Sequence, residues 1–142
     1  MLMDEQTVQT LKLIVQKKGM VRLPASGKSM YPLIQQGDIC EFVQIDPQAI
    51  EKGDIILFIT EGQLVAHRFF QKNQEHRCLF KGDANLGFDQ PVSDEQLIGK
   101  LVKIKRKDKT ISLNSLIPAV WGKLIGAFPF ISMLINKKIV KA

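Results

Sequence analysis

Two strands joined by a tight turn are predicted by residues 54–71, which read DIILFITEGQLVAHRFFQ. Residues 54–60 are nearly all apolar, which is typical of a strand buried on both faces. Glu61 and Gly62 are turn formers, and residues 64–71 are again rich in β-branched and aromatic side chains. This hairpin indicates the fold class, because its pattern is that of strands rather than of an amphipathic helix.

The strand pattern continues on both sides of this hairpin. Segment 39–45 alternates apolar and polar side chains, as a half-buried strand does, and Gly, Asp and Pro separate the apolar runs. The other predicted strands are 21–23, 77–80, 98–105 and 111–113. Short strands spaced in this way predict a mainly β domain with coiled antiparallel strands.

The N-terminal residues 4–18 are predicted to form a helix. An apolar stripe recurs at spacings of three and four residues, and Gly19 is a plausible stop. The stripe consists of Val8, Leu11, Ile14 and Val15. Charged residues interrupt the segment, so we expect neither a cleavable signal peptide nor a membrane span there.

The C-terminal residues 116–135 are apolar apart from Lys123 and a few small or polar residues. About 20 apolar residues could just span a bilayer as a helix, but Lys123 and Pro129 argue against a simple span. Three placements remain open: packing on the β core, peripheral membrane contact and a true span. The expected organisation is a helix over 1–20, a mainly β domain over 21–113 and an apolar, basic helical segment over 114–142.

Length and charge fit one folded domain with an uneven surface. The 142 residues are 45% hydrophobic, which suits a single domain with its own core. Residues 100–142 carry ten basic side chains and one acidic, which favours an anionic membrane, an acidic partner or nucleic acid. Lys103, Lys105 and Lys107 alternate along a strand with Arg106 opposite, as on a solvated edge, so no nucleic-acid partner is expected.

The two cysteines do not predict a metal site. Cys40 and Cys78 each lie in an apolar, strand-like run, without a CxxC or Cys/His ligand spacing. We expect free, half-buried thiols, no bound metal and no cofactor.

The candidate nucleophile is Ser29, within the segment 24–32, PASGKSMYP. Gly27 allows close approach of backbone and substrate, and the following proline restricts the chain. A serine needs a base to become nucleophilic. His67 is the histidine on a predicted strand, whereas His76 lies in a polar loop. Taken alone, the segment also fits an ordinary loop, and His67 fits a sheet histidine.

Two aspartates follow in the segment 81–91, KGDANLGFDQP. Either Asp83 or Asp89 could orient a histidine and stabilise its cation, or both could be turn residues. Asp38 and Asp54 each follow a glycine and are interpreted as turn residues.

In their order and spacing, these segments resemble the type I signal peptidases and the related self-cleaving repressor proteases, that is, the S24 and S26 serine peptidases. The resemblance covers about residues 21–105. It rests on 26–32, 37–38, 52–56, 66–68, 81–85, Asp89 and 98–100. His67 and Arg68 stand where the endoplasmic-reticulum-type branch has its His-Arg pair, so the chain resembles a compact bacterial member of that Ser-His branch.

The resemblance implies a serine endopeptidase that cleaves a peptide or precursor protein. Ser29 would be the nucleophile and His67 the general base. Asp89 or Asp83 would hold the imidazole, with Asp89 preferred because the family's acid lies beyond the Gly-Asp pair. The backbone N–H groups of Gly27 and Ser29 would stabilise the oxyanion, and the peptide would add as a strand in an extended groove.

Two features depart from signal peptidases. No membrane span directly precedes Ser29, and Gly27 stands where signal peptidases often have a serine, as in the repressor branch. The alternatives are therefore a non-catalytic peptide-binding module with the same groove and a repressor-like self-cleaving protease. The expected location is membrane-associated or cytoplasmic, and the size motivates the hypothesis of a dedicated peptide precursor as substrate.

Overall fold

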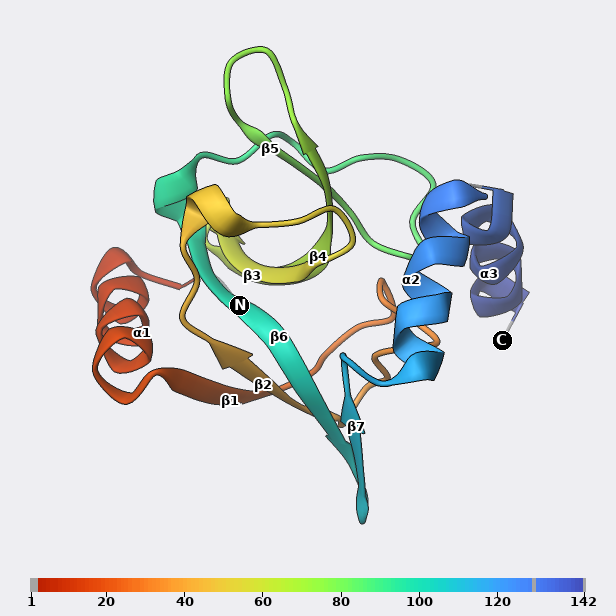
Figure 1. Cartoon of the computed structure of the whole chain (residues 1–142), viewed down its shortest axis with the longest axis horizontal. Coiled ribbons are helices and arrows are strands. Elements are labelled where there is room, and N and C mark those ends of the chain that lie inside the picture. Colours follow the sequence, from red (N-terminus) through yellow and green to blue (C-terminus); the bar gives the residue numbers. More distant parts are fainter. Residues whose placement is uncertain (1–2, 129, 142) are drawn as a thin grey trace.

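One antiparallel sheet of seven strands forms the centre of the molecule (Figure 1). The computed structural model describes residues 3–128 and 130–141. The strands are β1 (Met20–Pro24), β2 (Ile39–Val43), β3 (Ile55–Thr60), β4 (Gln63–Lys72), β5 (Cys78–Lys81), β6 (Leu97–Arg106) and β7 (Lys109–Ser112). The predicted mainly β class with coiled antiparallel strands is therefore confirmed.

The strand order is β1-β2-β6-β3-β4-β5, and β7 pairs with β6. Strand β6 joins the two halves of the sheet, because it pairs with β2 along one part of its length and with β3 along another. The register shifts between Glu41 and Phe42 in β2 and between Leu57 and Phe58 in β3. Such irregularities bend strands and increase their twist, and β3 and β4 are strongly curled (Figure 1).

The hairpin that indicates the fold class forms as expected. Glu61 and Gly62 have φ of 50° and 76°, the positive values of a two-residue turn that matches the twist of the strands. Strand β3 contributes to two separate apolar clusters. Ile55 and Leu57 pack in one of them, and Ile56 and Phe58 pack in the other. The continuous apolar run of β3 thus reflects burial on both faces.

Helix α1 (Glu5–Lys18) begins and ends as the sequence predicts. The Asp4 carboxylate accepts a hydrogen bond from the Thr7 N–H, and Gly19 ends the helix at a φ of 78°. Val8, Leu11 and Val15 are buried, as expected for the apolar stripe. Ile14, also assigned to the stripe, is exposed, because it lies at the stripe's edge.

Helices α2 (Leu116–Ala127) and α3 (Phe130–Lys141) lie next to each other on one side of the molecule, away from α1 (Figure 1). Each has 12 residues, or about 18 Å of helix. Within the described residues no single helix is long and apolar enough to cross a membrane. The two pass that test only together, across a bend of 107°.

Asp38 differs from the expectation of a plain turn residue. Its buried carboxylate accepts two hydrogen bonds from Arg106, at 2.8 and 2.7 Å, and one from the Gln35 N–H at 2.8 Å. Burial acts to raise the pKa of Asp38, but the contacts with Arg106 and Gln35 outweigh it and lower that pKa. The Arg106 side chain, expected on a solvated strand edge, therefore ties β6 to the loop before β2.

The cysteines are free but more deeply buried than expected. Cys40 and Cys78 are 3% and 0% exposed, because both face the apolar clusters of the sheet. Burial raises the pKa of the Cys40 thiol to about 11. A thiol in this state is chemically inert near neutral pH.

Candidate active site

Ser29 lies in the loop that joins β1 to β2, and its neighbours hold it in place. Met30 is buried in the core, and its carbonyl accepts the Ile34 N–H at 3.0 Å. Gly27 has a φ of 82°, a left-handed conformation that favours glycine. Ser29 itself is half-buried, so its hydroxyl sits on a fixed turn that remains accessible.

His67 meets Ser29 from strand β4. Its Nε2 lies 2.9 Å from Ser29 Oγ, although the two residues are 38 positions apart in the chain. His67 is 7% exposed and pairs across the sheet with Ile56. The Phe58 ring meets the imidazole edge-on, with centroids 6.2 Å apart. The position of the imidazole is thus fixed by the strand pairing of β4 and by its contact with the Phe58 ring.

Asp89 completes a chain of three polar side chains. Its Oδ2 lies 2.5 Å from His67 Nδ1, and its backbone N–H donates to the Phe80 carbonyl at 2.9 Å. A carboxylate can only accept, so Nδ1 is the protonated nitrogen when His67 is neutral. Nε2 is then free to accept the Ser29 hydroxyl proton, which is the arrangement that general-base activation of a serine requires.

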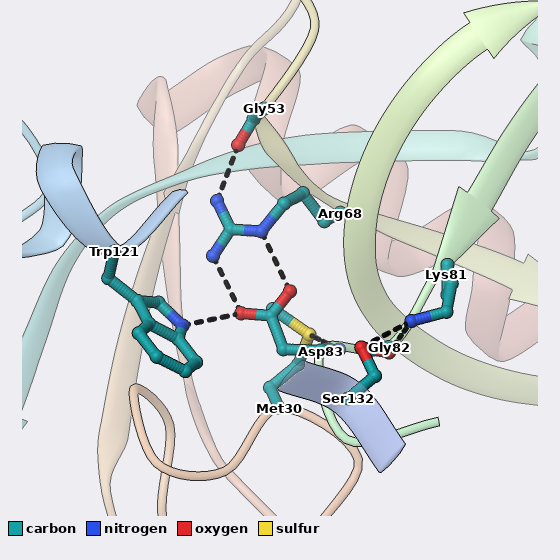
Figure 2. A network of polar contacts seen from close by, with 8 residues as sticks. All are labelled: Met30, Gly53, Arg68, Lys81, Gly82, Asp83, Trp121 and Ser132. Carbon is teal, nitrogen blue, oxygen red and sulfur yellow. Dashed lines mark hydrogen bonds and ion pairs between the residues drawn. The ribbon is translucent and has the colours of Figure 1, made fainter. Parts of the chain in front are cut away.

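Asp83 does not share this site. Its carboxylate accepts two hydrogen bonds from Arg68, Nε at 2.8 Å and Nη2 at 2.7 Å, and a third from Trp121 Nε1 at 2.9 Å (Figure 2). His67 and Arg68 are neighbours on β4, so their side chains point to opposite faces of the strand. That alternation separates the two aspartates, with Asp89 beside the imidazole and Asp83 beside the guanidinium.

A groove of about 560 Å³ passes the Ser29 hydroxyl and the His67 ring. One wall comes from the end of β1 and the loop after it, and the other from residues 64–67 of β4. The floor is apolar and includes Ile34, Phe42 and Leu57. Ligand sites commonly have this character, with an apolar lining and a few polar groups at one point.

The two backbone N–H groups that the sequence analysis assigns to an oxyanion site are unpaired among the described residues. Within residues 3–128 and 130–141, the N–H groups of Gly27 and Ser29 find no hydrogen-bond acceptor in the protein. Both residues line the groove. Among the described residues, no cluster of three or more His, Cys, Asp or Glu side chains could hold a metal ion.

Sequence comparison extends this picture. Residues 2–102 match the family described as Peptidase S24-like. The chain belongs to the Peptidase S24-like family. No curated protein matches it at a significant level. The matched range contains Ser29, His67, Asp83 and Asp89, and it ends before α2 and α3 begin.

Several polar residues near the site were not assigned roles from the sequence. The Arg68 guanidinium also donates from Nη1 to the Gly53 carbonyl at 2.9 Å. Lys81 is buried, and its Nζ donates to Ser132 Oγ at 2.6 Å. Burial lowers the pKa of Lys81, although Asp83 and Asp89 act to raise it. The sequence singles out Arg68 only as the neighbour of His67. No spacing rule links Lys81 or Asp83 to the helices that contact them.

Proposed function

We propose that the protein is a serine endopeptidase of the Ser-His branch, similar to the endoplasmic-reticulum-type signal peptidases, and that it cleaves a peptide or precursor protein. The observation that carries the proposal is the connected set Ser29, His67 and Asp89, with contacts of 2.9 and 2.5 Å. The His-Arg pair on β4 and membership of the S24-like family support the same reaction class.

The chemistry is acyl transfer by a serine nucleophile. Ser29 Oγ attacks the scissile carbonyl carbon while its proton passes to His67 Nε2. Asp89 stabilises the imidazolium, which then gives the proton to the leaving amine. A water molecule, activated by the same imidazole, hydrolyses the acyl-enzyme and restores Ser29. The N–H groups of Gly27 and Ser29 stabilise the oxyanion, at roughly 2.7–4 kcal/mol per donor.

The groove suggests how a peptide is held. Among the described residues, strand β1 has a neighbouring strand on one side only. Strand β5 pairs with β4 from residue 68 onward, so no described strand pairs with that edge of residues 63–67. An extended peptide can add to such edges through main-chain hydrogen bonds. The apolar floor around Ile34 and Leu57 favours a substrate with apolar side chains next to the scissile bond.

The two alternatives have separate signatures. A repressor-like protease would cut its own chain, which electrophoresis of the incubated protein would reveal. A peptide-binding module would bind peptides in the groove and leave them intact. Our proposal predicts a third outcome, which is cleavage of a separate peptide. The groove lined by Ser29 and His67 is where that peptide would bind.

Peptide cleavage by the purified protein tests the proposal. A pool of extended peptides with apolar residues at varied positions is incubated with the parent protein, with Ser29→Ala and with His67→Ala, and products are read by mass spectrometry. We expect cleavage by the parent protein alone. Peptide binding without cleavage by all three proteins would favour the binding module, and cleavage by Ser29→Ala would exclude Ser29 as the nucleophile.

A further inference from the structure

The loop after β5, residues 82–85, lies directly on the backbone of the proposed nucleophile. The Ala84 N–H donates to the Ser29 carbonyl at 2.9 Å, and the Asp83 N–H approaches Met30 Sδ at 3.4 Å. A Cβ added at Gly82 would lie 2.8 Å from the Ser29 carbonyl oxygen. This loop is therefore in direct contact with the Ser29 backbone and has little room to move against it.

Side chains from α2 and α3 contact this loop and the end of β5 (Figure 2). Trp121 Nε1 donates to Asp83 Oδ2 at 2.9 Å, and Ser132 Oγ accepts from Lys81 Nζ at 2.6 Å. Asn136 Nδ2 donates to the Ala84 carbonyl at 3.2 Å. Both helices lie outside the part of the chain that matches the peptidase family.

These contacts join polar groups that are buried, so losing a hydrogen-bond partner there would cost free energy. The Asp83 side chain is 1% exposed, and Ser132 is also 1% exposed. Hydrogen bonds to a charged group are stronger than those between neutral groups, and a buried group that loses its partner incurs a desolvation cost. A helix pair fixed by such contacts restrains the loop more firmly than apolar packing alone.

We propose that Trp121 and Ser132 are positioning residues, which act through Asp83 and Lys81 to keep Ser29 within reach of His67. The inference rests on the proposed peptidase function and adds the C-terminal helices to the machinery. Ser132 and Lys81 are not a second Ser-Lys site, because no substrate carbonyl can reach a hydroxyl buried to this extent. Their pairing fixes the chain at the end of β5.

The first test separates positioning from folding. Trp121→Phe removes the N–H donor and keeps an aromatic ring, and Ser132→Ala removes the hydroxyl. Leu13→Ala, at an exposed position of α1, is the control. With a fluorophosphonate probe, we expect each of the first two variants to lower the maximal labelling rate about tenfold. The probe concentration that gives half of the maximal rate should change by less than about twofold, and both variants should still unfold cooperatively on heating. Parent-like rates in both folded variants would overturn the inference.

The second test does not depend on activity. Trp121 is the single tryptophan of the chain, so one indole N–H resonance reports on its contact with Asp83. We expect this resonance to exchange slowly with solvent and to shift in Asp83→Asn. An indole signal that is insensitive to Asp83→Asn would overturn the inference even in an active enzyme. A slowly exchanging, Asp83-sensitive indole in a protein that no probe labels would instead count against the peptidase function.

A different observation concerns the opposite face of the same helices. Large apolar side chains there are exposed by between 41% and 81%. They are Leu116, Ile117, Val120, Leu124, Phe128, Phe130, Met133 and Leu134. Leu116, Val120 and Leu124 recur every four residues, so they form one stripe along α2, and Phe130, Met133 and Leu134 share a face of α3. An apolar surface of this extent marks an interaction site.

The charge around this face favours an anionic lipid surface as its occupant. The exposed Lys123, Lys137 and Lys138 lie on or beside the apolar face, and residues 100–142 carry ten basic side chains against one acidic. Helices of 12 residues are too short to cross about 30 Å of hydrocarbon singly. Amphipathic helices flanked by lysine instead lie in the membrane interface. We infer that the outer face of α2 and α3 rests on such a surface.

Vesicle flotation tests this second inference. The parent protein is mixed with vesicles of phosphatidylglycerol and phosphatidylcholine or of phosphatidylcholine alone. Leu124→Glu is compared with Leu13→Glu, which changes an exposed leucine on α1. We expect binding to the anionic vesicles only, weaker at high salt, at least tenfold reduced by Leu124→Glu and unchanged by Leu13→Glu. No vesicle binding, or a dimer that Leu124→Glu dissolves, would overturn the lipid assignment.

Discussion

Replacing Gly82 with alanine should slow the reaction of Ser29 and still allow the protein to fold. A Cβ at this position would stand 2.8 Å from the Ser29 carbonyl oxygen, 2.6 Å from Asn85 Nδ2 and 3.0 Å from Asn85 Cγ. The Asn85 side chain can rotate away, but the Ser29 carbonyl belongs to the backbone. Since an ordinary contact begins near 3.4 Å, the backbones of Gly82 and Ser29 must separate by about 0.6 Å.

That shift is large on the scale of the site. If it carries Ser29 away from His67, the 2.9 Å contact between Oγ and Nε2 lengthens to about 3.5 Å, where a hydrogen bond is weak or absent. A misplacement approaching 1 Å can cost about 100-fold in rate. We therefore expect Gly82→Ala to lower the rate constant of probe labelling by about 100-fold.

Gly87 provides the matched control within the same connection. A Cβ added there meets nothing within 4 Å, and the residue has no left-handed φ. Gly87→Ala should label within about twofold of the parent rate, and both variants should unfold cooperatively. Equal labelling by Gly82→Ala, Gly87→Ala and the parent protein would refute the idea that the 82–85 loop sets the position of Ser29.

Three further predictions concern the aspartates. Asp89→Asn should lower peptide cleavage by up to about 10⁴-fold, with little change in melting temperature, because an amide favours the wrong imidazole tautomer; steady-state kinetics and calorimetry check this. Asp83→Ala should lower the free energy of unfolding by about 3–5 kcal/mol, because the buried Arg68 guanidinium loses its carboxylate partner and keeps only its hydrogen bond to the Gly53 carbonyl; urea titration checks this. The Asp38–Arg106 pair stabilises the fold above the unfolded aspartate pKa of about 3.9. Its contribution is lost as pH falls through the lowered folded pKa of Asp38, so Asp38→Asn should flatten the acid limb of a stability–pH curve.

The β architecture was predictable because its signals are local. The apolar run of β3, the Glu61–Gly62 turn and the Asp4 and Gly19 caps of α1 each specify a backbone conformation within a few residues. The strand limits shift by only one or two residues between prediction and structure in most cases. The burial of Asp38 was not predictable, because its partner Arg106 lies 68 residues away.

The site was predictable in part. Ser29, His67 and Asp89 were named from the resemblance, but nothing in the residues alone decided between Asp83 and Asp89. Their separation depends on the alternation of His67 and Arg68 along β4 and on the path of the loop after β5. Trp121 and Ser132 carried no signal, because their contacts join segments 38 and 51 residues apart.

Covalent labelling of the parent protein tests the central claim most directly. The protein is treated with a peptide-like fluorophosphonate, beside Ser29→Ala and His67→Ala, and the modified residue is located by mass spectrometry. An adduct on Ser29 of the parent protein, absent in Ser29→Ala and strongly reduced in His67→Ala, is the predicted result. Labelling of the parent protein that persists in His67→Ala, or no adduct on Ser29 in any of the three, would contradict a Ser29 nucleophile activated by His67.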